Sequence, residues 1–477
     1  MHDLRRRALE RGEAGKTLSR KQRTRVTSGL APASAPSSLN ASLNNSRAAS
    51  RTNSRPPSRH DSDDEDDTGL SDSTFSLGSL DAALEEDIAT TTGGVGLMER
   101  VEAVIGKDKK AKEARERDLA ALAYVLTHSV GTAELEGREL TVVRGLLKVV
   151  GRGTEDDEGE REAVLGLRAL AAVFLTSPTE SLFAATVSPL KRTIVDALSN
   201  TIKTAGLHAL GLAAYYGGAG EPEIVSTMRF LLDIIQSDGG SVEATDEGEV
   251  VVAALEEWGF LATRVRFSED EDVEEAMDAF IDQLESSDAS VQVATGENIA
   301  LVFEKSRIAT DELDSDDESD YEPDDAADED ADDIDSEEED EEEKGYRKIY
   351  TPIAPHTMPS LESTLSDLAT TSARSLNAAT RRRLHSSFTD ILHSVSYPTH
   401  GPRYSTALDH NTGRELGSRL VVRLGGPGKS GGEVRVNKWW KLHRLQALRR
   451  VLQGGLSTHL LENESVFQTI PVLITRK

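Results

Sequence analysis

An apolar pattern that recurs about every 43 residues is the feature that most constrains how this chain folds. Five alanine-rich segments can be aligned, beginning at residues 120, 163, 205, 253 and 294. Within them Leu, Val and Ile recur three and four residues apart, as in helices that bury one face. A period of roughly 40 to 47 residues with two or three helices per unit is typical of armadillo and HEAT repeats. We therefore predict an all-α, armadillo/HEAT-like helical-repeat solenoid over residues 95–310.

Charge is divided unevenly along the chain. The net charge of −30 comprises +10 for residues 1–60, −29 for 61–310, −23 for 311–343 and +12 for 344–477. Basic ends favour phosphate or acidic surfaces, and the acidic tract between them can compete for those ends or serve only solubility. Because an acidic solenoid attracts cations, we expect its concave face to bind a basic protein segment rather than bare nucleic acid, unless the acids merely solvate the convex side.

Two segments have compositions that predict disorder. Residues 1–94 form a basic and then acidic arm, and residues 311–345 form an acidic linker with 23 Asp and Glu by residue 343. Such segments bury too little apolar area to offset the entropy of ordering. The linker is interpreted as a spacer, a mimic of DNA for histones, or an inhibitor of the basic ends. Basic or acidic neighbours make four serines candidate phosphosites: Ser50, Ser54, Ser58 and Ser62.

The C-terminal part is predicted to be mostly irregular over residues 346–433, apart from an element at 380–395 that docks on the last repeat. A small basic domain follows at 434–470. It consists of a short strand at 433–436 and a helix at 438–452, capped by Asn437 and ended by Gly454 and Gly455. Its apolar stripe comprises Leu442, Leu445, Leu448 and Leu452.

Cations near this stripe are the candidate RNA- or phosphate-binding residues, although they would also suit ordinary surface charge at a helix C-terminus. They are Arg381, Arg382, Arg383, Lys438, Lys441, Arg444, Arg449 and Arg450. Trp439 and Trp440 either stack on bases or pack in a core.

No pattern indicates catalysis, a metal, a cofactor or a small-molecule substrate. The Gly428-Lys429-Ser430 tripeptide lacks the earlier glycine of a phosphate-binding loop, and neither an HExxH nor a GxSxG motif is present. The chain has no cysteine and no apolar run of about 20 residues, which argues against secretion and membrane insertion. We predict a non-enzymatic protein located in the cytoplasm, the nucleus or both.

Two parts of the chain resemble the interferon-related developmental regulator family, in a fungal-type form. The first is the end of the repeats, residues 296–304 (GENIALVFE), with an acidic stretch behind it. The second comprises residues 383–392, the NKWW sequence at 437–440, QALRRVLQGGL at 446–456, and His459, Asn463, Glu464, Val466 and Phe467. The resemblance implies an armadillo-like domain with a small C-terminal domain, no catalytic activity, and roles in transcriptional co-regulation or in binding ribosomes to restrain translation.

The leading hypothesis is therefore a ribosome- or RNA-associated translational regulator. Its basic C-terminal region would contact ribosomal RNA and its repeat surface would bind proteins. The alternative is a transcriptional co-regulator scaffold that recruits corepressor or chromatin proteins. An armadillo-type transport adaptor would need a ladder of Asn and Trp along the repeats, of which Trp258 and Asn298 give only a hint.

Overall fold

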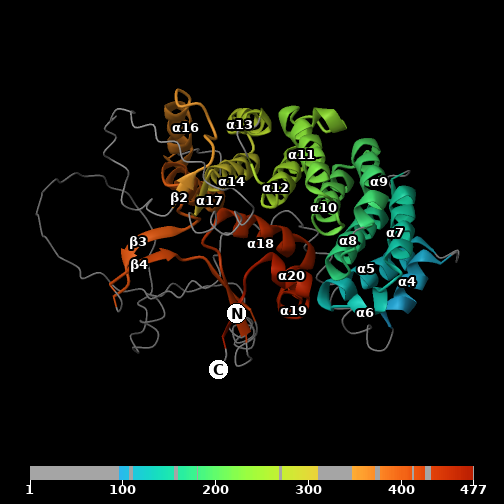
Figure 1. Cartoon of the computed structure of the whole chain (residues 1–477). Coiled ribbons are helices and arrows are strands. Elements are labelled where there is room, and N and C mark those ends of the chain that lie inside the picture. The colour runs from blue at the N-terminus through green and yellow to red at the C-terminus, as the bar shows by residue number, and fades with distance from the viewer. Residues whose placement is uncertain are drawn as a thin grey trace, which may run out of the picture. The chain divides into compact units, whose positions relative to one another are not determined.

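The computed structural model describes residues 96–106, 111–154, 159–179, 181–267, 271–309, 346–370, 377–410, 413–424 and 431–475. All of them belong to one unit, residues 65–477. Most are helical. The long helices pack in neighbouring pairs that form two layers, as Figure 1 shows. The inner layer comprises α5 (Lys112–His128), α8 (Glu160–Thr176), α10 (Asn200–Tyr216), α12 (Gly248–Ala262), α14 (Ala289–Lys305) and α17 (Ala378–Ser396). The outer layer comprises α4 (Leu97–Ile105), α7 (Glu139–Gly153), α9 (Leu182–Asp196), α11 (Glu221–Gln236), α13 (Glu271–Gln283) and α16 (Met358–Thr370).

The recurring alanine-rich segments all fall on inner helices. The segments that begin at 120, 163, 205, 253 and 294 lie in α5, α8, α10, α12 and α14 respectively. Each inner helix packs against its own outer partner and against the inner helices before and after it. Because α8 is covered on several sides, every residue from Glu162 to Thr176 is buried. The periodicity thus predicted the repeat correctly, and the fold is an all-α repeat solenoid.

Small residues on the inner helices permit close contact between neighbouring repeats. A Cβ atom at Gly296 of α14 would lie 2.6 Å from Cδ1 of Ile391 in α17. One at Gly259 of α12 would collide with the Asn298 amide and the His443 ring. Asn298 itself is buried and donates from Nδ2 to the Leu255 carbonyl, 2.9 Å away, which joins α14 to α12. These three residues therefore serve packing. Asn298 is buried, so it is not part of an exposed row of asparagines that could bind a transported peptide.

Short elements connect and extend the helix pairs. They are α6 (Thr132–Leu135), η2 (Gly240–Val242), β1 (Arg307–Ala309) and β2 (Tyr346–Lys348). Strands β1 and β2 pair antiparallel, with Arg307 opposite Lys348 and Ala309 opposite Tyr346. Residues 1–94 and 311–345, predicted as disordered, lie outside the described residues.

The segment 346–433 is more regular than predicted. Helices α16 and α17 add a sixth pair to the solenoid, and an antiparallel hairpin follows, β3 (Tyr404–Leu408) with β4 (Glu415–Ser418). The prediction of a mostly irregular segment was therefore wrong. The docking element predicted at 380–395 falls within α17, where Leu384, Phe388 and Ile391 are buried, and α17 packs on α14.

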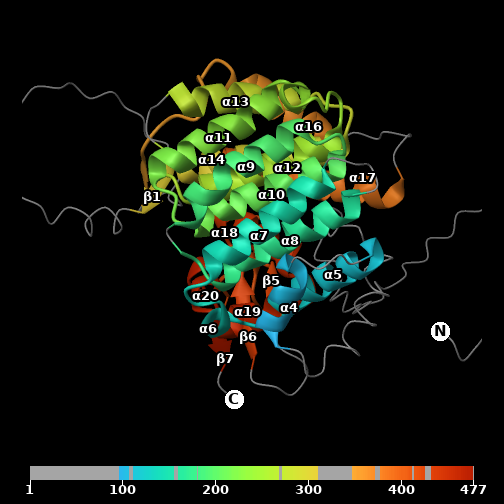
Figure 2. The ribbon, with the colours of Figure 1, turned by 90° about the vertical axis from the view of Figure 1, so that its right-hand side faces the viewer.

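The remaining residues form the C-terminal part of the fold. Its elements are β5 (Val421–Leu424), β6 (Gly431–Arg435), α18 (Trp439–Leu452), η4 (Gln453–Gly455), α19 (Leu456–Glu462), α20 (Glu464–Thr469) and β7 (Leu473–Thr475). The strands form an antiparallel sheet in the order β5-β6-β7. In Figure 2, α18 lies between two groups of elements. Helices α11 and α13 are above it, and α19, α20, β6 and β7 are below it.

Candidate functional site

Helix α18, on which most candidate phosphate contacts were placed, lies along the inner layer of the solenoid (Figure 1). It packs against α5, α8, α12 and α14. The predicted apolar stripe is buried, and so are Trp439, His443 and Arg450, which lie off that stripe. Since α18 is covered on more than one side, it is an integral part of the core rather than a free amphipathic helix.

The N-terminus of α18 is held by a carboxylate from α14. Oε2 of Glu304 accepts from the amide of Trp439 at 2.7 Å, and Oε1 accepts from the amide of Trp440 at 3.1 Å. An anion at this position satisfies free amides and complements the helix dipole. Burial raises the pKa of Glu304, while Lys438 and the two amide bonds act in the opposite direction. The Trp439 indole is 2% exposed and donates to Ser394 Oγ of α17 at 2.7 Å, so it serves packing.

The other end of α18 is joined to α12 by buried charges. The Arg450 guanidinium lies 2.8 Å from Glu257 and 3.5 Å from Glu256, and Glu257 also contacts Nδ1 of His208 at 2.8 Å. Burial lowers the pKa of Arg450, but the two glutamates outweigh it and hold the pKa above its ordinary value. Arg450 is 8% exposed. The ion pair between Arg450 and Glu257 therefore joins α18 to α12 of the solenoid.

Two further contacts fasten the middle of α18 and the helices behind it. Arg444 donates to the Thr263 carbonyl at 2.9 Å and to the Thr469 carbonyl at 3.0 Å. Asn463, between α19 and α20, donates from Nδ2 to the Leu175 carbonyl of α8 at 2.8 Å. Burial lowers the pKa of His443 to about 4, which keeps this inward-facing ring neutral at physiological pH.

These contacts bear on the predicted phosphate-binding set. Arg444 and Arg450 are engaged within the protein, so they are poorer candidates for contacts with RNA phosphates than the sequence indicated. The apolar periodicity of the sequence predicts the buried stripe of α18, but it does not show which residues face the cations of that helix. Those residues include glutamates of α12, nearly 200 residues earlier in the chain. Glu256, Glu257 and Glu304 of the inner helices contact α18 of the same chain, and the binding of a basic segment from another protein stays a prediction.

The other cations of α18 are partly accessible. Lys438 donates to the Thr399 carbonyl at 3.0 Å and lies over the Tyr346 ring, 5.2 Å from its centroid. Lys441 donates to Asn437 Oδ1 at 2.7 Å. Arg449 is half-buried. Their role in binding phosphate stays a prediction.

The arginine cluster, Arg381, Arg382 and Arg383, occupies the first turns of α17. Asn377 caps this helix, its Oδ1 accepting from the Thr380 amide at 2.7 Å. Arg382 is exposed, and the two flanking arginines are half-buried. Leu384 and Phe388 anchor the same helix in the core, so the cluster is presented from a rigid element.

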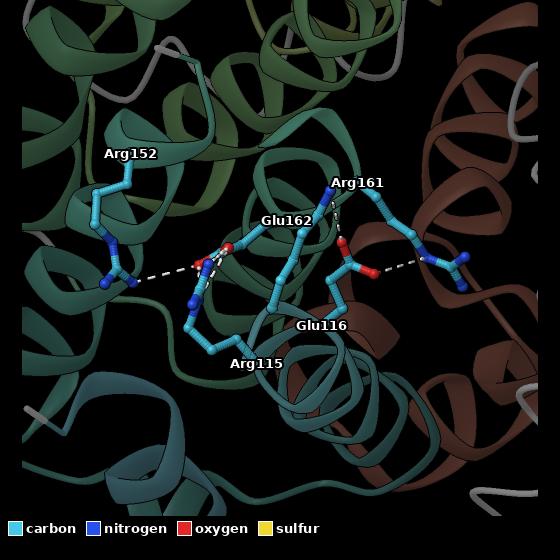
Figure 3. Close-up of polar contacts among 6 residues, drawn as sticks. Arg115, Glu116, Arg152, Arg161 and Glu162 are labelled. Carbon is cyan, nitrogen blue, oxygen red and sulfur yellow. Dashed lines mark hydrogen bonds and ion pairs between the residues drawn. The ribbon is translucent and has the colours of Figure 1, made fainter. Parts of the chain in front are cut away.

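A separate ionic network lies in the first repeats, where Figure 3 shows it. Arg115 of α5 contacts the buried Glu162 of α8 at 2.8 Å, and Arg152 of α7 approaches the same carboxylate at 3.4 Å. Arg161 and Glu116 form a longer pair at 3.9 Å. Because three arginines share two carboxylates that lie on neighbouring helices, the network joins α5, α7 and α8.

The other sequence predictions concern phosphosites, metal binding and membrane insertion. Ser50, Ser54, Ser58 and Ser62 lie outside the described residues. Within the described part of the chain, no group of three or more His, Asp or Glu side chains is arranged to hold a metal ion. No described helix is both long and apolar enough to cross a membrane.

Comparison with known proteins adds a family assignment to this geometry. Residues 68–396 match the family described as Interferon-related developmental regulator (IFRD). An uncharacterized protein of Schizosaccharomyces pombe is 26% identical over 410 residues, which cover 84% of this chain and 80% of that protein. Mouse interferon-related developmental regulator 2 is 26% identical over 384 residues, 77% of this chain and 71% of the mouse protein. The chain therefore belongs to the interferon-related developmental regulator family.

Proposed function

We propose that this protein is a non-enzymatic translational regulator that binds ribosomal RNA through the arginine cluster of α17. Membership of the family indicates a regulatory rather than a catalytic protein. Its action on translation and its RNA target are our inference.

One observation carries the proposal. Arg444 and Arg450 make internal contacts, whereas the arginine cluster includes the exposed Arg382, on a helix that packs on α14 of a solenoid with net negative charge. Phosphate contacts from arginines give affinity without requiring a particular base sequence. The half-buried Lys441 and Arg449 of α18 are further candidates.

The same geometry directs protein partners to other surfaces. Helices α18–α20 pack on α5, α8, α12 and α14, so these stretches of the inner face are already covered. We infer that proteins contact the outer helices of the solenoid.

Sedimentation of the tagged full-length chain on polysome gradients tests the RNA proposal. We expect ribosome co-sedimentation that RNase and high salt abolish. The variant Arg381→Ala/Arg382→Ala/Arg383→Ala should sediment at the top of the gradient. Its matched control is Arg144→Ala/Lys148→Ala/Arg192→Ala, which removes three exposed cations from α7 and α9. Each lost phosphate contact should also reduce the slope of log affinity against log salt by about 0.7–0.9.

Three outcomes decide the matter. Loss with the α17 variant but not with the control supports the proposed contact. Equal loss with both variants contradicts the site, because net charge alone then explains binding. Nuclear enrichment without RNA-dependent sedimentation rejects the translational role in favour of a transcriptional co-regulator scaffold.

A further inference from the structure

Four aromatic rings gather where α17 ends and the chain turns into β3. We call them the ring cluster: His393, Tyr397, His400 and Tyr404. The rings of His400 and Tyr404 are stacked with centroids 3.7 Å apart and planes 7° apart. His393 lies 5.0 Å from His400 with an interplanar angle of 23°. Three rings are thus nearly parallel.

Hydrogen bonds hold three of these rings. His400 Nδ1 and His393 Nε2 are 2.9 Å apart, and the Tyr404 hydroxyl donates to Glu415 at 2.7 Å. Ser394 Oγ donates to the His400 carbonyl at 2.9 Å. The rings against which Tyr397 packs are therefore held in place before any ligand arrives, which reduces the entropy lost on binding.

Tyr397 is the accessible member of the cluster. It is 40% exposed, whereas His400 is 8% exposed. Its ring is 5.4 Å from His400 and 5.2 Å from His393. A partly exposed aromatic side chain that packs against other rings resembles the platforms on which unpaired bases stack.

Two basic residues lie near this platform. Lys438 donates to the Thr399 carbonyl, between Tyr397 and His400 in the chain, and lies over the 38% exposed Tyr346 ring. Arg419 is exposed and its amide donates to the Arg403 carbonyl at 3.3 Å. Carboxylates are present too: Glu415 accepts from Tyr404, and burial raises the pKa of Asp390 to about 6. Lys438, held at Thr399, therefore places a cation beside Tyr397.

We propose that the ring cluster is a base-stacking site for single-stranded RNA, with Tyr397 as the contact ring and Lys438 as a phosphate contact. This inference rests on the RNA-binding function proposed above and adds the kind of RNA that the protein prefers. Stacking requires an open base face, which a duplex does not present along its length. The site should therefore distinguish unpaired from paired RNA.

Fluorescence anisotropy with the full chain tests this inference. The probes are a labelled oligouridylate of about 12 nucleotides and a duplex of the same length. Titrations span about 50–200 mM salt, because salt separates phosphate contacts from stacking. The variants are Tyr397→Leu, Tyr397→Phe and the control Phe467→Leu, which removes a 37% exposed ring from α20.

We expect Tyr397→Leu to weaken oligouridylate binding about tenfold at every salt concentration, without changing the salt slope. Tyr397→Phe and Phe467→Leu should bind like the unmodified chain, and duplex binding should be equal for all of them. The arginine-cluster variant should instead lower the slope. The thermal midpoint of each variant checks that folding is intact.

The failures of the two proposals can be distinguished. Unchanged oligouridylate affinity in Tyr397→Leu overturns the stacking site but leaves RNA binding through the arginine cluster standing. Equal loss in Tyr397→Phe, or equal loss for the duplex, also overturns it. Absence of binding to both probes, together with absence of ribosome co-sedimentation, overturns the proposed function and the stacking site with it.

Discussion

The buried ion pair between α18 and α12 gives a quantitative test of how the C-terminal part is held. Arg450→Met keeps a long aliphatic side chain but removes the guanidinium that contacts Glu256 and Glu257. The Arg450 and Glu257 side chains are 7% and 2% exposed, so the substitution leaves buried carboxylate charge without its cation. Breaking a buried pair in this way costs about 3–5 kcal/mol. We expect the free energy of unfolding to fall by that amount.

Urea unfolding followed by tryptophan fluorescence measures this loss, because Trp439 begins the same helix. The control Arg144→Met, on the exposed face of α7, should change stability by less than about 0.5 kcal/mol. Adding Glu257→Gln to Arg450→Met removes one of the stranded charges. The double variant should therefore be less destabilised than the sum of the single variants. A loss below about 1 kcal/mol for Arg450→Met, with additive effects in the cycle, would refute the reasoning.

Three other predictions concern the same region. Glu304→Gln keeps one acceptor but sets an NH2 donor against the other backbone amide, so stability should fall by about 1 kcal/mol and hydrogen exchange at the Trp439 and Trp440 amides should accelerate. Burial raises the pKa of Glu297 from 4.5 to about 7, so the folded state holds its proton more tightly and stability falls as pH rises through that window. Glu297→Gln should therefore be more stable than the unmodified chain near about pH 8 and equal to it near about pH 4.5, as urea titrations at both pH values can check. The acids of residues 311–343 should compete with RNA for nearby cations, because this tract precedes β2, whose Tyr346 lies under Lys438. Replacing these acids by amides should therefore strengthen RNA binding, and only at low salt, where charges are least screened. Equal RNA affinity at low salt would contradict this competition.

The repeat could be predicted from sequence because its cause is local. The inner helices must carry small or apolar side chains on several sides, and this requirement recurs wherever one helix pair packs on the next. The sixth pair was missed because α16 carries many Ser and Thr residues and buries only Leu361 and Leu365. Its sequence is therefore close in composition to a loop, and only the docking of α17 on α14 reveals its place.

The candidate site was predictable only in part, for a different reason. The cations of α17 and α18 are visible in the sequence, but their partners are set by tertiary contacts. Arg450 meets Glu257 across 193 positions, and Arg444 meets Thr263 across 181. The ring cluster was not predicted, although His393, Tyr397, His400 and Tyr404 lie within twelve residues of one another. Their spacing of three and four residues was a usable signal.

The docked position of α18 has a consequence for protein partners. Because α18 belongs to the same chain as the inner helices, it competes for their acidic face at an effective concentration on the order of millimolar. A free basic peptide at about 1 µM would need roughly thousandfold tighter binding than α18 to displace half of it. Displacement would also break the Arg450–Glu257 pair and expose Trp439. The outer layer can be contacted without that cost, so protein partners should bind there.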